Sequence, residues 1–239
     1  MYSYDGWQFY FQRSLAIVRL YFRKSDSRIV VIGDSHSRII KNSYGVLSHH
    51  VGPVTLHRMG DSTEMEILLR ESLSFPRRLR FLHFPALSKN SIIVLSFGEI
   101  DIRVHVARQA KIKSVEPIGL VEGLVDDALN LISFIQSSIG CKIIFLAVPP
   151  PVADFNDPKY PTVGDLGERI AWVNLFNSFL EAQLLDRPDL RARVMNVNKL
   201  FSNLDGTMRS EYSDGTVHFG ENVVLTSLSQ LETYKEVDF

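Results

Sequence analysis

The first candidate catalytic residue in this chain is a serine that directly follows an apolar run of strand length. Ser35 lies in Gly33-Asp34-Ser35-His36, just after the apolar run 28–32. A serine becomes a good nucleophile when a neighbouring base takes its proton, and that base works better when a third group orients it. At a strand-to-helix turn, backbone N–H groups point toward the place where an oxyanion forms. Ser35 is therefore a candidate nucleophile, and its own N–H is a candidate oxyanion donor.

A candidate base lies near the C-terminus of the chain. His218 follows Asp214 by four residues. An imidazole beside a serine can take its proton, and a carboxylate beside the imidazole favours the imidazolium that forms. The pattern predicts that Ser35, His218 and Asp214 act as nucleophile, base and orienting acid, with Ser35 and His218 within hydrogen-bond reach. His36 is interpreted as a hydrogen-bonding residue of the turn and not as a second base.

A polar segment follows a second buried apolar run, at 98–105. Glu99, Asp101, Arg103 and His105 alternate with apolar residues, which places the four side chains on one face if the segment is extended. Two interpretations are open. One is a substrate-binding set beside Ser35, with Arg103 suited to a carboxylate or to sugar hydroxyls. The other is an ion pair of Arg103 with Glu99 or Asp101 that shapes the loop.

Apolar runs of strand length alternate with segments of helical period along most of the chain. The expected strands are 28–32, 54–59, 91–97, 141–148 and 193–197, and the expected helices are 37–47, 61–70, 120–138, 166–185 and 221–234. This alternation predicts an α/β fold, a three-layer α/β/α sandwich around a five-stranded parallel sheet. Ligands in such sheets bind at the carboxyl ends of the strands, where Ser35, Gly60 and segment 98–105 fall.

The composition of the whole chain excludes several classes of partner. The formal net charge of −1 over 239 residues gives no global attraction to nucleic acid. No uninterrupted apolar segment is long enough to span a membrane. The lone cysteine, Cys141, forms no disulfide framework, so we expect a reducing, cytoplasmic location. Residues 1–26 are expected to form an amphipathic helix that packs on residues 27–239, on a second copy in a homo-oligomer, or on a membrane surface.

Four short segments resemble the conserved blocks of the SGNH (GDSL) hydrolases, a family of serine esterases and acyl hydrolases. Val31 to Ser37 is similar to the first block, and Gly60 falls at the second-block glycine, an oxyanion donor. Segment 98–101 resembles the third block, Gly-x-Asn-Asp, and segment 214–218 resembles the last, Asp-x-x-His. The resemblance implies the flavodoxin-like fold of that family and an activity that needs neither metal nor cofactor. It implies removal of an acyl group, such as acetyl, from a glycan or small ester.

Two positions depart from the family's pattern. Ile100 stands where the family has its oxyanion asparagine, and an isoleucine side chain has no donor. We therefore expect Arg103 or His105 to point into the Ser35 pocket and supply one. Asp214 precedes His218 by four residues instead of three. Either a one-residue bulge brings the two together, or His218 bonds to a backbone carbonyl and acts with Ser35 as a dyad.

Two other functions fit parts of the sequence. Segment 34–36 also resembles the Asp-x-His of the calcineurin-like metallophosphoesterases, where Asp34, His36, Asp61 and His218 would hold two metal ions. Alternatively, Ile100 and the shifted Asp214 fit a non-catalytic, glycan-binding protein that keeps the fold without turnover.

Overall fold

The computed structural model describes seven stretches of the chain, which hold a sheet, its covering helices and the candidate catalytic residues. These stretches are residues 29–40, 46–50, 54–61, 90–153, 157–196, 198–220 and 223. Apart from Asp61 and Val223, the helices predicted over 1–26, 61–70 and 221–234 lie outside the described residues. Among the described helices, none combines the length and the apolar character that crossing a membrane requires.

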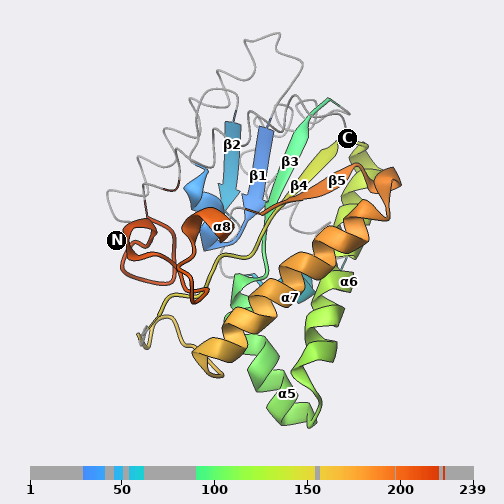
Figure 1. Ribbon diagram of the computed structural model, residues 1–239. Helices are drawn as coiled ribbons and strands as arrows, with labels where there is room; N and C mark the ends of the chain where they lie inside the picture. Colours follow the sequence, from blue (N-terminus) through green and yellow to red (C-terminus); the bar gives the residue numbers. More distant parts are fainter. Residues whose placement is uncertain are drawn as a thin grey trace, which may run out of the picture.

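All pairs of neighbouring strands in the sheet are parallel, as the alternation of strands and helices predicts (Figure 1). In spatial order the strands are β2 (Val46–His50), β1 (Ile29–Gly33), β3 (Ile92–Ser96), β4 (Lys142–Leu146) and β5 (Ala192–Met195). The chain passes from β1 to the edge strand β2 and then crosses back to β3 on the other side of β1. The direction of winding therefore reverses between β1 and β3. In open parallel sheets, ligands bind at the carboxyl ends of the strands beside such a reversal.

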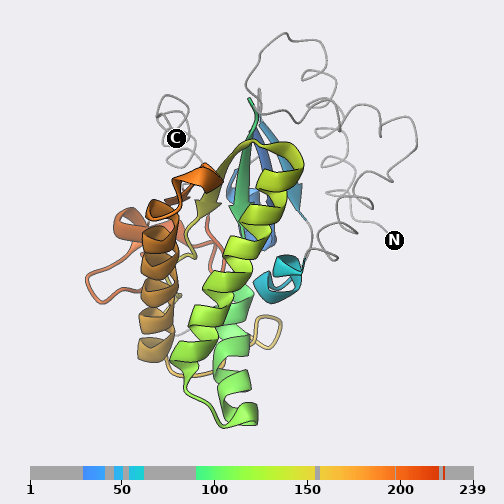
Figure 2. The ribbon, with the colours of Figure 1, turned by 90° about the vertical axis from the view of Figure 1, so that its right-hand side faces the viewer.

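Alternate residues of the central strand β3 enter two separate apolar cores. Ile93 and Leu95 pack on the side of α6 (Pro117–Ile139) and α7 (Leu166–Leu185), which lie side by side in both views (Figures 1 and 2). Val94 packs on the opposite side, where η1 (Ser35–Ile39) and α8 (Asn198–Phe201) contribute apolar side chains. The central strands β1, β3 and β4 are thus buried on both faces, which explains why they are nearly continuous apolar runs.

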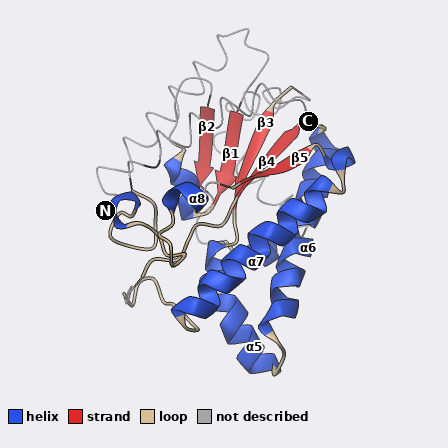
Figure 3. Ribbon diagram, in the orientation of Figure 1, coloured by secondary structure: helices blue, strands red, loops and turns tan. Residues whose placement is uncertain are grey.

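Five further helices complete the described helices of the chain, and Figure 3 draws helices in blue. They are α2 (Leu56–Gly60), the π-helix η3 (Asp101–Val106), α5 (Ala107–Lys113), η4 (Pro188–Leu190) and η5 (Ser210–Tyr212). Of these, α2 packs against α6, and η3 continues directly into α5.

The two long helices begin and end at residues whose types favour helix ends. Pro117 starts α6, and Gly140 ends it with a φ of +70° and an N–H that bonds to the carbonyl of Gln136 at 2.9 Å. A capping box starts α7, since Asp165 and Glu168 each accept the backbone N–H of the other. The predictions of helices at 120–138 and 166–185 are confirmed.

Two predictions around β2 are wrong. Of the helix expected over 37–47, the described residues form the 3₁₀ helix η1 up to Ile39 and the strand β2 from Val46, and 41–45 lie outside the described residues. The strand expected over 54–59 is the helix α2. Leu56 and Met59 are three residues apart and both buried, and the Thr55 hydroxyl accepts the N–H of Arg58 at 3.3 Å. A capped helical turn satisfies this apolar spacing as well as a strand does.

Segment 98–105 does not meet the condition under which its four polar side chains would share a face, because it is not extended. Glu99 and Ile100 form a helical turn that continues into η3. Residues four apart share a face of a helix, so Glu99 and Arg103 pair directly. The four polar side chains therefore do not form one polar face.

Candidate active site

The turn after β1 places Ser35 at the carboxyl edge of the sheet, as the first residue of η1. The N–H of Asp34 donates to the carbonyl of Ser96 at 3.0 Å, and the Asp34 carboxylate accepts the N–H of His36 at 2.9 Å. A Cβ on Gly33 would lie 2.4 Å from the Ser96 carbonyl oxygen, so this close approach to β3 requires glycine. The hydroxyl-bearing Ser35 is half-buried between two buried polar neighbours.

His36 is a buried link between this turn and the C-terminal part of the chain. Its Nε2 lies 3.2 Å from the carbonyl oxygen of Val217, and its Nδ1 lies 3.4 Å from the Asp34 carboxylate. Burial by itself lowers the pKa of His36, but the hydrogen bond and charge of Asp34, together with the charge of Glu99, raise it to about 9. His36 is therefore protonated near neutral pH, and its interpretation as a hydrogen-bonding residue of the turn is confirmed.

The turn that carries His218 is held by short polar contacts. Residues Ser213 and Phe219 form an antiparallel bridge that closes it. Within the turn, the Asp214 carboxylate accepts both the N–H of Thr216 at 2.8 Å and its hydroxyl at 2.6 Å. The same hydroxyl lies 2.8 Å from Nδ1 of His218, whereas the nearest Asp214 oxygen is 3.7 Å away. Thr216 thus stands between the carboxylate and the imidazole.

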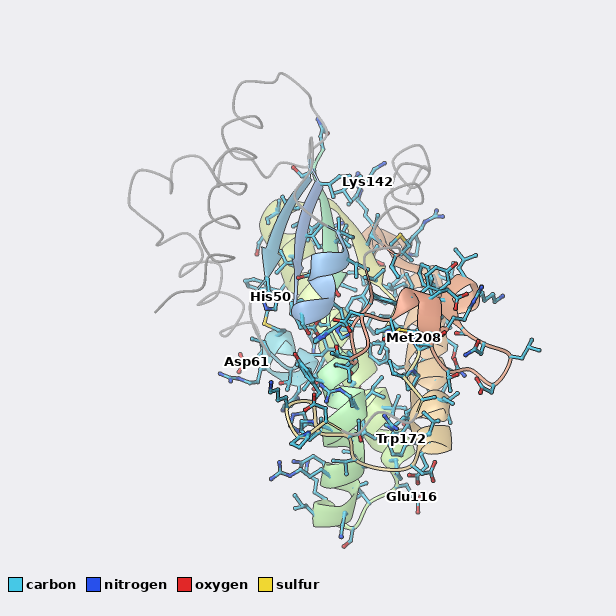
Figure 4. All side chains as sticks on the ribbon, turned by 90° about the vertical axis from the view of Figure 1, so that its left-hand side faces the viewer. His50, Asp61, Glu116, Lys142, Trp172 and Met208 are labelled. Carbon is cyan, nitrogen blue, oxygen red and sulfur yellow. The ribbon has the colours of Figure 1, made fainter. Side chains whose placement is uncertain are left out.

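The Ser35 turn and the His218 turn meet at one corner of the sheet. The rings of His36 and His218 are 5.2 Å apart between centroids, and the Tyr160 ring contacts His218 edge-on at 5.0 Å. Figure 4 labels His50 at the end of β2, whose Nδ1 lies 2.8 Å from the carbonyl oxygen of Asp34. Segments far apart in sequence therefore surround the residue next to Ser35, while the Ser35–His218 hydrogen bond itself stays a prediction.

Arg103 is held by an ion pair on its own helix. Its Nε and Nη2 donate to the two carboxylate oxygens of Glu99 at 2.5 and 3.3 Å, and Nη1 donates to the carbonyl of Pro161 at 2.5 Å. This is the ion pair that one of the two interpretations of the segment expected. With its guanidinium directed to these partners, Arg103 anchors the loop at Pro161 to η3.

Asp101 joins η3 to the beginning of α2. Its carboxylate is buried and accepts the N–H of Leu56 at 2.6 Å. Burial raises the pKa of Asp101 to about 6, and the nearby charge of Asp34 acts in the same direction against the backbone hydrogen bonds of Leu56 and His57. The prediction of Asp101 as a substrate-binding residue is not tested, but the structure gives its carboxylate a second role as the N-terminal partner of α2.

His105 lines a separate, open groove of about 590 Å³ between α2, α5 and α6. The side chain of Asp127, on α6, lies 2.8 Å from Nδ1 of His57 at the groove. Burial, with the charges of Arg108 and Arg103, lowers the pKa of His105. Arg103 lines another cavity, so the two candidate donors face different hollows.

Gly60 ends α2, where the helix contacts α6. A Cβ on Gly60 would lie 2.7 to 2.8 Å from Cβ, Cα and the carbonyl oxygen of Asp127. Close helix packing therefore explains the glycine at this position, and its N–H as an oxyanion donor stays a prediction.

The two-metal alternative gains no support from the geometry. Within the described stretches, no three His, Cys, Asp or Glu side chains form a group that could hold a metal ion. Asp61, which that alternative needs, is exposed at the end of α2.

Comparisons with known proteins find similarity in structure and not in sequence. No protein-family model matches the chain, and no curated protein sequence does. A Streptococcus pneumoniae protein named after platelet activating factor matches with a TM-score of 0.59, 12% identity and coverage of 94% of this chain and 91% of that one. A GDSL-like lipase from Bacteroides thetaiotaomicron matches with a TM-score of 0.55 and 14% identity, and the match covers 96% of this chain and 100% of the lipase. This chain has the GDSL-like hydrolase fold. The carbohydrate acetylesterase Est24 from Sinorhizobium meliloti matches with a TM-score of 0.51 and 14% identity, and the match covers 87% of this chain and 99% of Est24.

Sequence reasoning missed two residues that matter in this GDSL-like fold. Thr216 had a local signal, because Asp-Gly-Thr is typical of a turn in which the aspartate accepts a backbone N–H two residues on. Arg169, on α7, is only 7% exposed. Nothing near it in the sequence indicates burial, because the Pro149–Pro151 segment that helps to enclose it lies about twenty residues away.

Proposed function

We propose that this protein is a serine hydrolase that removes an acyl group, acetyl among them, from a carbohydrate or small ester. The observation that carries the proposal is the contact of His36 with both the His218 ring and the Val217 carbonyl, which brings two separate turns together beside Ser35. The corner lies at the reversal point of the sheet, where ligands bind in such folds. The named activities of similar structures, a lipase and a carbohydrate acetylesterase, agree with ester hydrolysis.

The proposed reaction has two balanced steps. Ser35 Oγ attacks the ester carbonyl carbon while its proton passes to Nε2 of His218. The tetrahedral intermediate collapses, the bond to the alcohol oxygen breaks, and His218 returns the proton to that oxygen. A water then attacks the acyl-serine in the same way, which releases the acid and restores Ser35.

In this mechanism, Thr216 connects Asp214 to His218 across their four-residue spacing. Its hydroxyl donates to the Asp214 carboxylate, so its oxygen can accept the Nδ1–H of His218. That arrangement selects the tautomer with a basic Nε2, which is the nitrogen that the reaction needs. The extra residue between Asp214 and His218 is thereby accommodated by a hydroxyl between them.

The oxyanion would be held by backbone groups. The N–H groups of Ser35 and Gly60 are the predicted donors, and Ile100 adds none. Arg103 directs its guanidinium to Glu99 and Pro161. Because one missing donor typically lowers the rate about a hundredfold to a thousandfold, we expect a slow esterase.

Covalent labelling tests the proposal directly. A fluorophosphonate probe should label the protein, and Ser35→Ala should abolish both labelling and the hydrolysis of a short-chain acyl ester. Ser137→Ala, which removes an exposed hydroxyl on α6, is the matched control and should keep both. A chelator should leave turnover unchanged. Labelling of the Ser35→Ala protein would identify another nucleophile. A wild-type protein that neither labels nor turns over any ester would favour the glycan-binding alternative.

A further inference from the structure

A narrow cavity next to the His218 turn contains one arginine more than it has carboxylates. Its lining includes Glu99, Arg103 and Arg169, together with apolar residues of segment 148–152 and Val217. Its enclosed volume of about 20 Å³ is the room of about one water, and the hollow measures about 380 Å³ when the space open to solvent is included, so a larger group approaches it from the solvent side.

Arg169 is the arginine of this cavity for which no ion pair within 4.0 Å is found among the described residues. The residue is only 7% exposed, and its Nε donates a long hydrogen bond of 3.4 Å to the Asp165 carbonyl. Among the described residues, Nη1 and Nη2 of Arg169 have no hydrogen-bond partner, and no carboxylate lies within 4.0 Å. Burial, and then the charge of Arg103, lowers the pKa of Arg169, while the charges of Glu99 and Asp165 raise it, and the guanidinium stays charged at any ordinary pH.

The neighbouring charges leave a net positive site. Glu99 is already paired with Arg103 through two hydrogen bonds. Arg169 is therefore an extra cation in this cavity, whose other lining residues, apart from Glu99 and Arg103, are isoleucine, valine and proline. Its Nη1 and Nη2 are not among the buried polar atoms that lack a partner, so they reach the open space of the cavity, where an anion with two oxygens matches the guanidinium fork.

The cavity shares a wall with the candidate active site. Val217 lines it, and the carbonyl oxygen of the same residue is the one near His36 Nε2. His218 is the next residue. A group bound at Arg169 thus lies next to the turn that carries the candidate base.

We infer that Arg169 binds a carboxylate of the substrate, so that the preferred ester is one with a negative charge close to the ester bond, such as an acylated acidic sugar. This inference rests on the proposed function for its substrate, although the anion site itself does not. Arg103 is paired with Glu99 on η3, so Arg169 is the arginine that binds the ligand.

Binding without turnover tests the anion site first. Acetate and acetamide have the same shape and differ in charge, so we would compare how each raises the melting temperature of the Ser35→Ala protein, because a ligand that binds the folded state stabilises it. Acetate should raise it and acetamide should not. Arg169→Gln in the same background should abolish the acetate effect, Arg169→Lys should keep part of it, and Arg108→Gln, which removes an exposed charge on α5, should keep all of it. Equal shifts with both probes, no shift with acetate, or an acetate shift that survives Arg169→Gln would overturn the inference.

Turnover then tests the substrate class. With acetylated glucuronic acid and acetylated glucose as matched esters, Arg169→Gln should raise KM for the first about tenfold or more, the effect of losing a charged hydrogen bond, and leave KM for the second unchanged. An equal effect on both esters would make Arg169 a structural residue. If wild type hydrolyses neither ester while acetate still binds through Arg169, the proposed function fails and the anion site stands.

Discussion

Two regions of this molecule hold candidate site residues in different ways. The turns around Ser35 and His218 are held by polar side chains that bond to nearby backbone, as Asp34 does to His36 and Asp214 does to Thr216. The region of η3, α5 and α6 is held by helix packing. In the turns, changing one polar atom disturbs the candidate site directly. In the helices, the size of side chain that a substitution can introduce depends on how close the backbone of the neighbouring helix lies.

The largest expected effect follows from breaking the link between the two turns. His36 has a pKa of about 9 in the folded protein against 6.5 for an ordinary histidine. A raised pKa means that the protonated form stabilises the fold fully below pH 6.5 and that this contribution is lost as pH rises through 9. It amounts to roughly 3 kcal/mol at most. In urea unfolding, the free energy of unfolding of the wild-type protein should decrease as the pH rises from 6.5 to 9. The His36→Gln substitution should remove most of this decrease. A variant with the wild-type pH dependence would show that His36 is not the titrating group.

A smaller effect is expected within the His218 turn alone. Thr216→Val keeps the side-chain shape and removes the hydroxyl, so kcat/KM should fall about tenfold to a hundredfold, on the scale of other residues that orient a catalytic group. Thr216→Ser should restore most of the rate. ¹⁵N NMR of His218 should show the Nδ1–H tautomer in wild type and a mixture in Thr216→Val.

A double-mutant cycle separates this orienting role from a purely structural one. If Thr216 connects Asp214 to His218, adding Asp214→Asn to Thr216→Val should lower the rate little further. A Thr216→Val protein that melts earlier but keeps its rate and its tautomer would limit the threonine to shaping the turn.

The smallest effect belongs to the helical region, where two glycines of helices should respond in opposite directions. Nothing lies within 4 Å of a Cβ added to Gly123 in α6, so Gly123→Ala should stabilise the protein by about 0.5 to 1 kcal/mol through helix propensity. Gly60→Ala would press on the Asp127 backbone and should destabilise it by about 1 kcal/mol or more. Thermal unfolding measures both, and shifts of the same sign would contradict the packing of α2 on α6.

The sequence by itself determined the parallel sheet apart from its edge strand β2, the two long helices and the turns that carry Ser35 and His218. These features rest on signals within a few residues, such as continuous apolar runs, Pro117 and Gly140 at the ends of α6, and glycine where β1 approaches β3. Local signals also predicted a Glu99–Arg103 pair as one of two alternatives. Such patterns are readable because the atoms that satisfy them are close in the chain.

Only the tertiary structure decided how the remaining residues are used. Residues 54–59 have an apolar spacing that fits a strand or a helix, and packing of α2 on α6 selects the helix. His36 becomes a buried cation because the fold buries it next to Asp34 and brings the charge of Glu99 near it, and both raise its pKa. Arg169 lies without an ion pair in a cavity that segment 148–152 helps to line. Burial and the distances between charges arise from contacts across the fold, and no short stretch of sequence contains them.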